Sequence, residues 1–213
     1  MDEVLHFPIR QDVINAFSGP SVDRRAASDG EEVNGYGWLS QDKDALPDQI
    51  TSAAVLVPLV ERDEGMTVLL TKRTKNLKSH AGQISFPGGK TEPEDKSPEE
   101  TALREAEEEI GLHSEKVEVV GRLGRRITGS GFEVTPVVAV IDPNILLQPN
   151  PREVAEIFEV PLSFVLNTNN HKRETRLIKG LEREFYVLPY QRYYIWGLTA
   201  RLLVALSTIL EKK

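Results

Sequence analysis

Short runs of β-branched and aliphatic residues dominate the chain from residue 50 onward. Residues 53–60 and 66–70 form two such runs, and the polar stretch 61–65 between them ends in glycine, so the pattern predicts a hairpin. Further runs of the same kind predict four more strands, over residues 117–123, 132–141, 175–178 and 185–188.

Three segments have helical patterns. Ser97 is a suitable cap, Pro98 suits the first helical position and Glu100 completes a capping box, so a helix is predicted from there to Ile110, ending at Gly111. An apolar helix is predicted over about 195–210 and a short amphipathic helix over 8–17. The aromatic residues near the start of the last helix are assigned to packing rather than binding: Tyr190, Tyr193, Tyr194 and Trp196.

The domain organisation follows from a change of pattern near residue 50. Residues 18–49 are rich in Gly, Ser, Asp and Asn and have little periodicity, which predicts a loop-rich segment. We therefore expect an N-terminal helix and loop-rich extension over residues 1–49, followed by one α+β domain over residues 50–213.

Composition and charge narrow the class of protein. The 213 residues are 39% hydrophobic and 28% charged, as in globular proteins, and the formal net charge of −7 argues against nucleic-acid binding. The chain contains no cysteine, which excludes thiolate zinc sites and cysteine nucleophiles. The apolar runs are far shorter than the roughly 18 residues of a membrane span, and the acidic N-terminus does not resemble a signal peptide. We expect a cytoplasmic protein with neither a membrane nor a nucleic acid as partner.

Four carboxylates stand within five positions of the predicted helix over 97–110. At helical spacing Glu105, Glu108 and Glu109 share one face, whereas Glu107 lies off it. Like charges at this spacing repel, and a bound divalent cation would reverse that effect. Oxygen-only ligands favour Mg²⁺ or Mn²⁺, although an arbitrary helix of this composition is more often simply a solvated acidic face.

The residues upstream of the helix favour the functional interpretation. Phe86-Pro87-Gly88-Gly89-Lys90 is expected to end a strand in a loop, where the two glycines let backbone N–H groups approach a phosphate. A Gly-Gly turn, a carboxylate about six residues later and a capped helix carrying Arg-Glu-x-x-Glu-Glu-x-Gly form a multi-element pattern.

In these elements the chain resembles the Nudix hydrolase superfamily, whose box reads G-x5-E-x7-R-E-U-x-E-E-x-G-U. The C-terminal half matches from Arg104 to Leu112, but one residue is inserted upstream, so Asp95 or Glu94 takes the place of the box carboxylate that braces Arg104. The resemblance implies a Nudix-type α/β/α sandwich with a mixed β-sheet between helices. It also implies hydrolysis of a nucleoside diphosphate derivative.

Residues 69–74 and 77–89, with sequences LLTKRT and LKSHAGQISFPGG, look like the signature of the coenzyme A pyrophosphatase branch. That branch also has the longer box spacing, and the resemblance extends over about residues 50–165. It implies that coenzyme A is the small-molecule substrate, split into 3′,5′-ADP and 4′-phosphopantetheine. Arg73 and Lys78, with Gly88 and Gly89, are the expected substrate contacts, and His80 is a weaker candidate.

The resemblance assigns the remaining roles. Glu105, Glu108 and Glu109 would hold the metal, Glu108 would take the proton from the attacking water, and Glu153 or Glu156 are rival bases or additional ligands. The alternatives are hydrolysis of other diphosphates, such as ADP-ribose, NADH, dinucleoside polyphosphates or oxidised dNTPs, and a non-catalytic binding module of the same fold. A homodimer is expected, with the apolar last helix as interface surface.

Overall fold

The computed structural model describes residues 8–18, 50–77, 79–178 and 181–211. The predicted loop-rich segment lies almost entirely outside the described residues, as does Lys78. In chain order the elements are α1 (Arg10–Phe17), β1 (Thr51–Arg62), β2 (Gly65–Arg73), β3 (Ile84–Ser85), β4 (Gly88–Lys90), α2 (Pro98–Ile110), β5 (Val117–Arg122), β6 (Arg126–Ile127), β7 (Phe132–Ile141), β8 (Val154–Pro161), α3 (Leu162–Leu166), β9 (Lys172–Ile178), β10 (Leu181–Tyr190), β11 (Tyr193–Trp196) and α4 (Gly197–Glu211), with single 3₁₀ turns at Ser114–Lys116 and Thr168–Asn170.

A mixed sheet forms the centre of the molecule. Its main path runs β3-β2-β1-β7-β5, and β4, β6 and β8 pair with β1, β7 and β2 respectively. β1 and β7 are parallel over ten residue pairs, whereas the other pairings are antiparallel. The long apolar stretches of β1 and β7 are buried on both faces, as expected for central strands that are covered on both sides.

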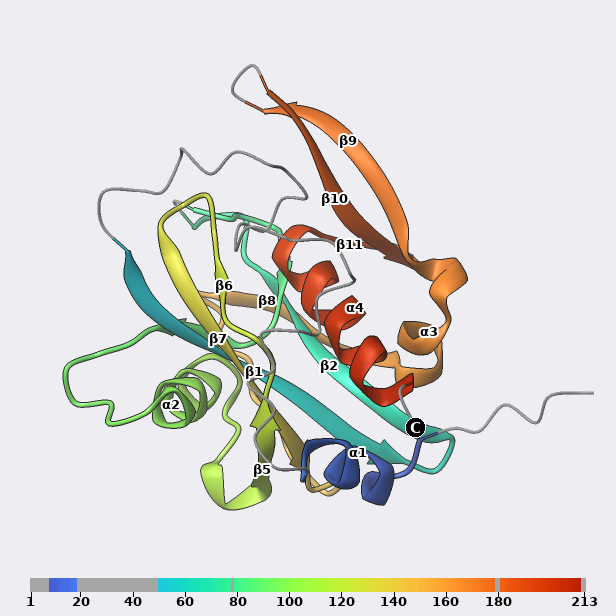
Figure 1. Cartoon of the computed structure of the whole chain (residues 1–213). Helices are drawn as coiled ribbons and strands as arrows, with labels where there is room; N and C mark the ends of the chain where they lie inside the picture. Colours follow the sequence, from blue (N-terminus) through green and yellow to red (C-terminus); the bar gives the residue numbers. More distant parts are fainter. Residues whose placement is uncertain (1–7, 19–49, 78, 179–180, 212–213) are drawn as a thin grey trace, which may run out of the picture.

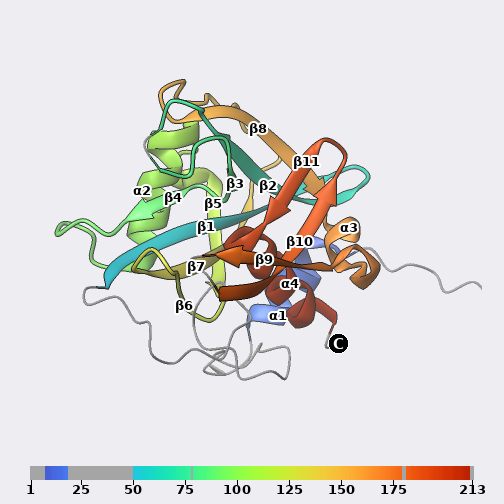
Figure 2. The ribbon, with the colours of Figure 1, turned by 90° about the horizontal axis from the view of Figure 1, so that it is seen from above.

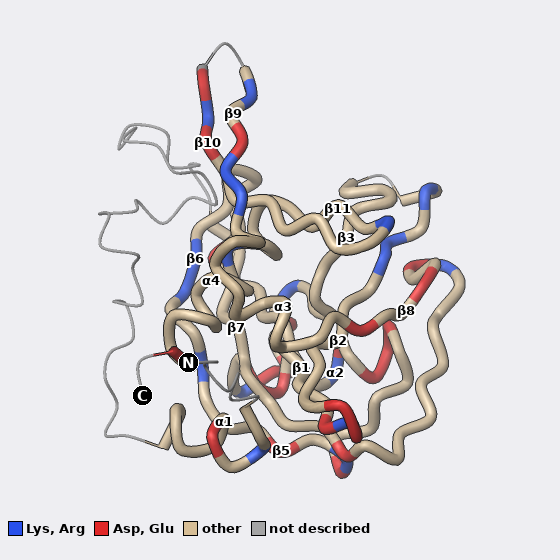
Figure 3. Tube along the Cα trace, turned by 90° about the vertical axis from the view of Figure 1, so that its right-hand side faces the viewer, with Lys and Arg blue, Asp and Glu red and all other residues tan. Residues whose placement is uncertain are grey.

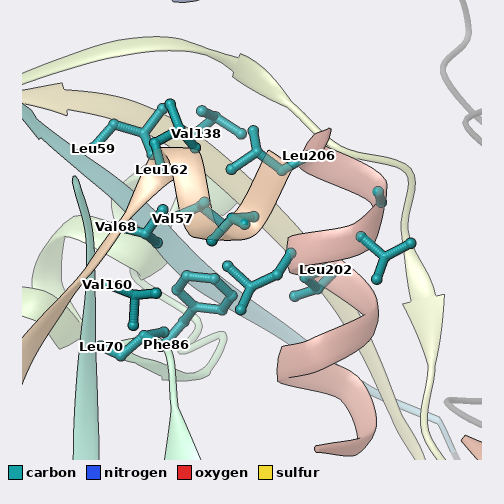
Figure 4. Close-up of a cluster of buried hydrophobic side chains, with 14 of the residues drawn as sticks. Val57, Leu59, Val68, Leu70, Phe86, Val138, Val160, Leu162, Leu202 and Leu206 are labelled. Carbon is teal, nitrogen blue, oxygen red and sulfur yellow. The ribbon is translucent and has the colours of Figure 1, made fainter. Parts of the chain in front are cut away.

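Helices cover both faces of this sheet (Figure 1). On one face α2 buries Ala102, Ala106 and Ile110 against β1 and β7. On the other face α1, α3 and α4 share a core with the opposite side of the same strands, where Leu202 and Leu206 of α4 lie over the sheet (Figure 4). The expected sandwich of helices around a mixed sheet is therefore confirmed.

The last helix belongs to this core, which corrects its expected role as interface surface. Leu202, Leu203 and Leu206 are at most 1% exposed, and they pack within the subunit. The helix also begins two residues later than predicted, because Ile195 and Trp196 still pair with β10. Of the described helices, none is long and apolar enough to cross a membrane.

The predicted strands over 175–178 and 185–188 are parts of a longer hairpin, β9–β10, which extends away from the sandwich (Figure 1). With β11 this hairpin forms a second, three-stranded sheet beside α4 (Figure 2). Positively and negatively charged residues are intermixed along both of its strands (Figure 3). Charged side chains are typical of exposed edge strands, where they discourage pairing with another chain.

Two further elements were not predicted as they occur. β8 pairs with β2, although Glu156 and Glu159 interrupt its apolar pattern. Glu159 is accommodated because it accepts hydrogen bonds from Arg62, at 2.6 Å, and from Thr67, at 2.6 Å. Residues 88–90, expected as a loop, form the short strand β4, which pairs with β1.

Candidate active site

Helix α2 has the termini that its sequence predicts. The Ser97 side chain accepts a hydrogen bond from the Glu100 N–H at 3.2 Å, and Pro98 is the first helical residue. At the other end Gly111 has φ 68°, a left-handed conformation that glycine adopts without strain, and its N–H donates to the Glu107 carbonyl at 2.9 Å. The apolar face against the sheet orients the opposite, carboxylate-bearing face.

The three carboxylates of that face differ in burial. The Glu109 side chain is 3% exposed, Glu105 is 17% exposed and Glu108 is 58% exposed. Burial raises the pKa of Glu109 to about 7, against the opposing effect of Arg73. Burial also raises the pKa of Glu105, and the charges of Glu108 and Glu153 add to the increase. Crowded negative charge is thus a real feature of this face. Glu107 lies off the face and contacts His113, at 2.8 Å.

Arg104 connects the carboxylates to the loop before the helix. Its Nε and Nη2 donate to the two carboxylate oxygens of Asp95, at 3.1 Å and 2.9 Å, while Nη1 donates to Glu105 at 3.1 Å and Glu108 at 3.3 Å. These hydrogen bonds hold the pKa of Asp95 well below its usual range. Of the two candidates for the brace, the structure selects Asp95; Glu94 is exposed.

Gly88 and Gly89 allow two close approaches. A Cβ on Gly88 would lie 2.4 Å from the Ala54 carbonyl oxygen, so only glycine lets β4 lie against β1 here. A Cβ on Gly89 would lie 2.3 Å from a carboxylate oxygen of Glu105. The Gly88 N–H, expected to face a phosphate, donates instead to Glu109 at 3.3 Å. The glycines therefore also serve to place the helix carboxylates.

Arg73, at the end of β2, lies between the carboxylates and the neighbouring space. Its Nη1 donates to Glu109 at 3.2 Å, and its Nε is buried without a hydrogen-bond partner among the described residues. The Arg73 side chain is 23% exposed, so its guanidinium is accessible from the neighbouring space and suited to receive an anionic oxygen.

The other candidates separate into two groups. Glu153, in the loop before β8, is close enough for its charge to raise the pKa of both Glu105 and Glu109. Glu156, on β8, instead accepts hydrogen bonds from Tyr193, at 2.7 Å, and from Arg192, and these lower its pKa. The exposed His80 contacts Gln83 through Nδ1 at 2.9 Å. The structure thus associates Glu153, but not Glu156, with the carboxylate face.

The donor set suits a hard divalent cation. All candidate ligands on the helix are carboxylate oxygens. Burial raises the pKa of Glu105 and Glu109, with a smaller effect from neighbouring carboxylates, and a bound cation would stabilise their charged forms. In the described part of the chain no group of three or more Asp, Glu or His side chains is arranged so that it could hold a metal ion. Glu109 is hydrogen-bonded to Arg73 and to the Gly88 N–H. Metal binding by Glu105, Glu108 and Glu109 stays a prediction.

A pocket of about 530 Å³ lies next to this face. Arg73, Gly88 and Gly89 line it together with the loop 128–130 and the start of α4 at residues 196–199. Trp196, assigned to packing from the sequence, is one of the lining residues, and so are Phe132 and Leu198. No local motif pointed to these positions, because Phe132 on β7 and Trp196 and Leu198 lie far apart in the sequence and meet only in the folded chain, where β11 packs against β3 and Thr199 donates to the Ile84 carbonyl.

Comparison with known proteins identifies the family. The sequence model described as NUDIX domain matches residues 50–181. The chain is 44% identical over 162 residues to an uncharacterized Nudix hydrolase NudL of Photorhabdus laumondii, covering 76% of this chain and 86% of that protein. A protein of the same description from Yersinia enterocolitica is 44% identical over 155 residues, covering 73% of this chain and 79% of that protein. The chain therefore belongs to the Nudix hydrolases.

Among solved structures, a Nudix hydrolase from Alicyclobacillus acidocaldarius aligns with a TM-score of 0.48 at 20% identity, covering 75% of this chain and 91% of that one. RenU, a Nudix hydrolase from M. smegmatis, aligns with a TM-score of 0.47 at 25% identity, covering 59% and 79%. The names of the curated relatives specify no substrate.

Proposed function

We propose that the protein hydrolyses the diphosphate bond of coenzyme A and its derivatives, releasing 3′,5′-ADP and 4′-phosphopantetheine or its acyl form. The observation that carries this proposal is the position of Arg73. This residue belongs to the segment that resembles the coenzyme A pyrophosphatase signature, and it donates a hydrogen bond to Glu109 while it lines the pocket.

Glu105, Glu108 and Glu109 would hold Mg²⁺ or Mn²⁺. When bound, such a cation neutralises charge on the diphosphate and lowers the pKa of the attacking water. Arg104 positions two of these carboxylates. Its guanidinium is held by hydrogen bonds to Asp95 and donates to Glu105 and Glu108. Arg73, whose side chain is 23% exposed and lines the pocket, would bind a diphosphate oxygen through its guanidinium, which supplies charge-assisted orientation of the substrate.

Glu108 is the proposed base. It is the most exposed of the three carboxylates, so a water molecule has access to it, and its hydrogen bond from Arg104 fixes its position. Glu153 is the rival, because its charge acts on Glu105 and Glu109 from a separate loop. The partners of Glu156 argue against that residue.

A turnover panel with product identification tests the proposal. Coenzyme A, acetyl-coenzyme A, ADP-ribose, NADH, diadenosine polyphosphates and 8-oxo-dGTP would be compared at equal concentration with Mg²⁺ and with Mn²⁺. We expect metal-dependent release of 3′,5′-ADP, with coenzyme A preferred at least about tenfold in kcat/KM, which corresponds to about 1.4 kcal/mol. Preference for another diphosphate would overturn the substrate and leave the hydrolase chemistry in place.

Two variants of adjacent glutamates distinguish catalysis from binding. Glu108→Gln should abolish turnover, whereas Glu107→Gln, on the same helix but directed to His113, should leave it within about twofold of wild type. Turnover that survives Glu108→Gln would transfer the role of base to Glu153. No turnover of any diphosphate by the wild-type protein would favour a non-catalytic binding module.

A further inference from the structure

The pocket beside the carboxylate face has a wall that comes from outside the matched family domain. The match ends at residue 181, whereas Trp196, Gly197, Leu198 and Thr199 all line the pocket. On its other side the pocket reaches Arg73, Gly88 and Gly89, which contact the helix carboxylates. A group attached to one end of a diphosphate bound at Arg73 would therefore have this C-terminal wall as a neighbour.

The C-terminal wall is held firmly in place. Thr199 Oγ1 donates to the Ile84 carbonyl on β3 at 3.0 Å, which ties the first turn of α4 to the sheet. Ile195 is fully buried, and the Trp196 ring packs edge-on against Phe185 with ring centroids 5.5 Å apart. The half-buried side chains of Trp196 and Leu198 thus form a preformed surface.

This pocket offers a ligand apolar surface and positive charge. Its apolar lining includes Val55, Phe86, Phe132, Val134, Trp196 and Leu198. Its charged or ionisable lining residues in the described chain are Arg73, Lys90 and His80, with no Asp or Glu among them. A volume of about 530 Å³ is in the range of small-molecule sites.

The hydroxyl side chains of the lining have partners within the protein, and each keeps the capacity for a further hydrogen bond. Ser85 shares a hydrogen bond with Thr71 at 3.3 Å, and Thr128 accepts one from the Phe132 N–H at 3.0 Å. Ser130 pairs with Thr128 at 3.0 Å. The apolar side chains of the C-terminal wall offer a sugar hydroxyl no such partner, and a hydroxyl buried against them without one costs about 1–3 kcal/mol. The pantetheine arm has methyl and methylene groups beside its two amides and can place carbon against this wall, whereas every ring carbon of a ribose bears an oxygen.

We propose that this pocket binds the pantetheine arm of the substrate, and that Trp196 and Leu198 are specificity-determining residues that favour the methyl and methylene groups of this arm over a sugar. The inference rests on the proposed function, because it takes the diphosphate to lie at Arg73 and the helix carboxylates. Residues beyond the matched family domain would then select between coenzyme A and sugar-linked diphosphates.

Kinetics on two substrates tests the assignment. Trp196→Ala and Leu198→Ala are each expected to raise KM for coenzyme A about tenfold, with kcat changed less than twofold and kcat/KM for ADP-ribose unchanged within twofold. Tyr194→Ala and Leu146→Ala are matched controls, since neither side chain lines the pocket and both are exposed. Melting temperatures of all four variants identify any that fail to fold.

An unchanged preference in both pocket variants, or an equal loss on both substrates, would overturn the assignment while the proposed function stands. If the wild-type protein hydrolyses no diphosphate in the presence of metal, the proposed function fails instead. In that case a direct binding measurement still tests whether the pocket takes the pantetheine arm.

Binding is measured through the fluorescence of Trp196. Trp38 is the only other tryptophan, so the variant Trp38→Phe isolates the signal. We expect a saturable change with 4′-phosphopantetheine that Leu198→Glu abolishes, and no change with ribose 5-phosphate. A change with 3′,5′-ADP but none with 4′-phosphopantetheine would mean that the pocket takes the adenine end, and would overturn the proposal.

Discussion

The brace between Asp95 and Arg104 supports a quantitative prediction for the variant Asp95→Asn. Asp95 accepts four hydrogen bonds, two from the Arg104 guanidinium, one from Thr101 at 3.0 Å and one from the Glu92 N–H at 2.9 Å. An asparagine side chain has a single acceptor oxygen, and its NH₂ group would face donors. The substitution keeps the shape of the side chain while it removes the charge and half of its accepting capacity.

The expected loss of stability is about 2 kcal/mol. Removing one partner from a fully buried ion pair costs about 3–5 kcal/mol. Here the Arg104 side chain is 23% exposed and keeps acceptors in the Lys90 carbonyl, Glu105 and Glu108, so the cost should lie below that range. For a chain of this length about 2 kcal/mol lowers the melting temperature by about 4–8 °C. Because Arg104 also holds two helix carboxylates, activity should fall about 10- to 100-fold.

Urea unfolding of wild type, Asp95→Asn and Glu94→Gln measures the effect. Glu94 is exposed and adjacent, so its variant is the matched control and should change the free energy of unfolding by less than about 0.5 kcal/mol. Since the pKa of Asp95 is depressed in the folded protein, its contribution is present above about pH 4 and is lost as the pH falls through the folded value. Equal stability of wild type and Asp95→Asn at pH 7, or equal losses in the two variants, would refute the assignment of the brace.

Three further predictions concern the neighbouring residues. Gly88→Ala should destabilise the protein by at least about 2 kcal/mol, because the added Cβ would meet the backbone of β1. Gly89→Ala should instead lower activity at least tenfold with little change in melting temperature, because its Cβ would meet the movable carboxylate of Glu105. With chelator present, the free energy of unfolding should fall by up to about 3 kcal/mol as the pH rises from about 4.5 to 7, because the buried Glu109 must ionise. Glu109→Gln should remove this pH dependence in urea titrations. A pH dependence that persists in the variant would show that Glu109 is not its source. Glu153→Gln should reduce kcat several-fold and Glu156→Gln should not, since only the former acts on the helix carboxylates, and the opposite order would reverse these roles.

Helix α2 was predictable from the sequence because its determinants are local. The Ser97 cap, Pro98 and the left-handed Gly111 act within one turn of the chain, and the spacing of Ala102, Ala106 and Ile110 sets which face is buried. The hairpin of β1 and β2 was predictable for the same reason. Both elements have the hydrophobic period and the terminal residues that their structure requires.

The elements that sequence reasoning missed depend on contacts between distant residues. β8 contains Glu159, whose partial burial is tolerated because Arg62 on β1 and Thr67 on β2 donate to it. β4 is a strand because Gly88 can approach the backbone of β1, a contact that no local pattern reveals. The choice of Asp95 over Glu94 as the brace likewise depends on the path of the loop before α2. Pairing over long sequence separations was the information that the linear pattern lacked.

This division between local and distant determinants separates the chemistry of the site from its selectivity. The carboxylate face and its brace lie within residues 88–109, so a short segment specifies the groups that would act on a diphosphate. The pocket beside them also requires Trp196 and Leu198, nearly ninety residues further on, which are positioned by the bond between Thr199 and the carbonyl of Ile84. Exchanging residues 196–199 between Nudix hydrolases should therefore change which diphosphate is preferred without changing the dependence on metal. If that exchange altered metal dependence instead, the two parts would not be separable and the pocket would belong to the chemical step.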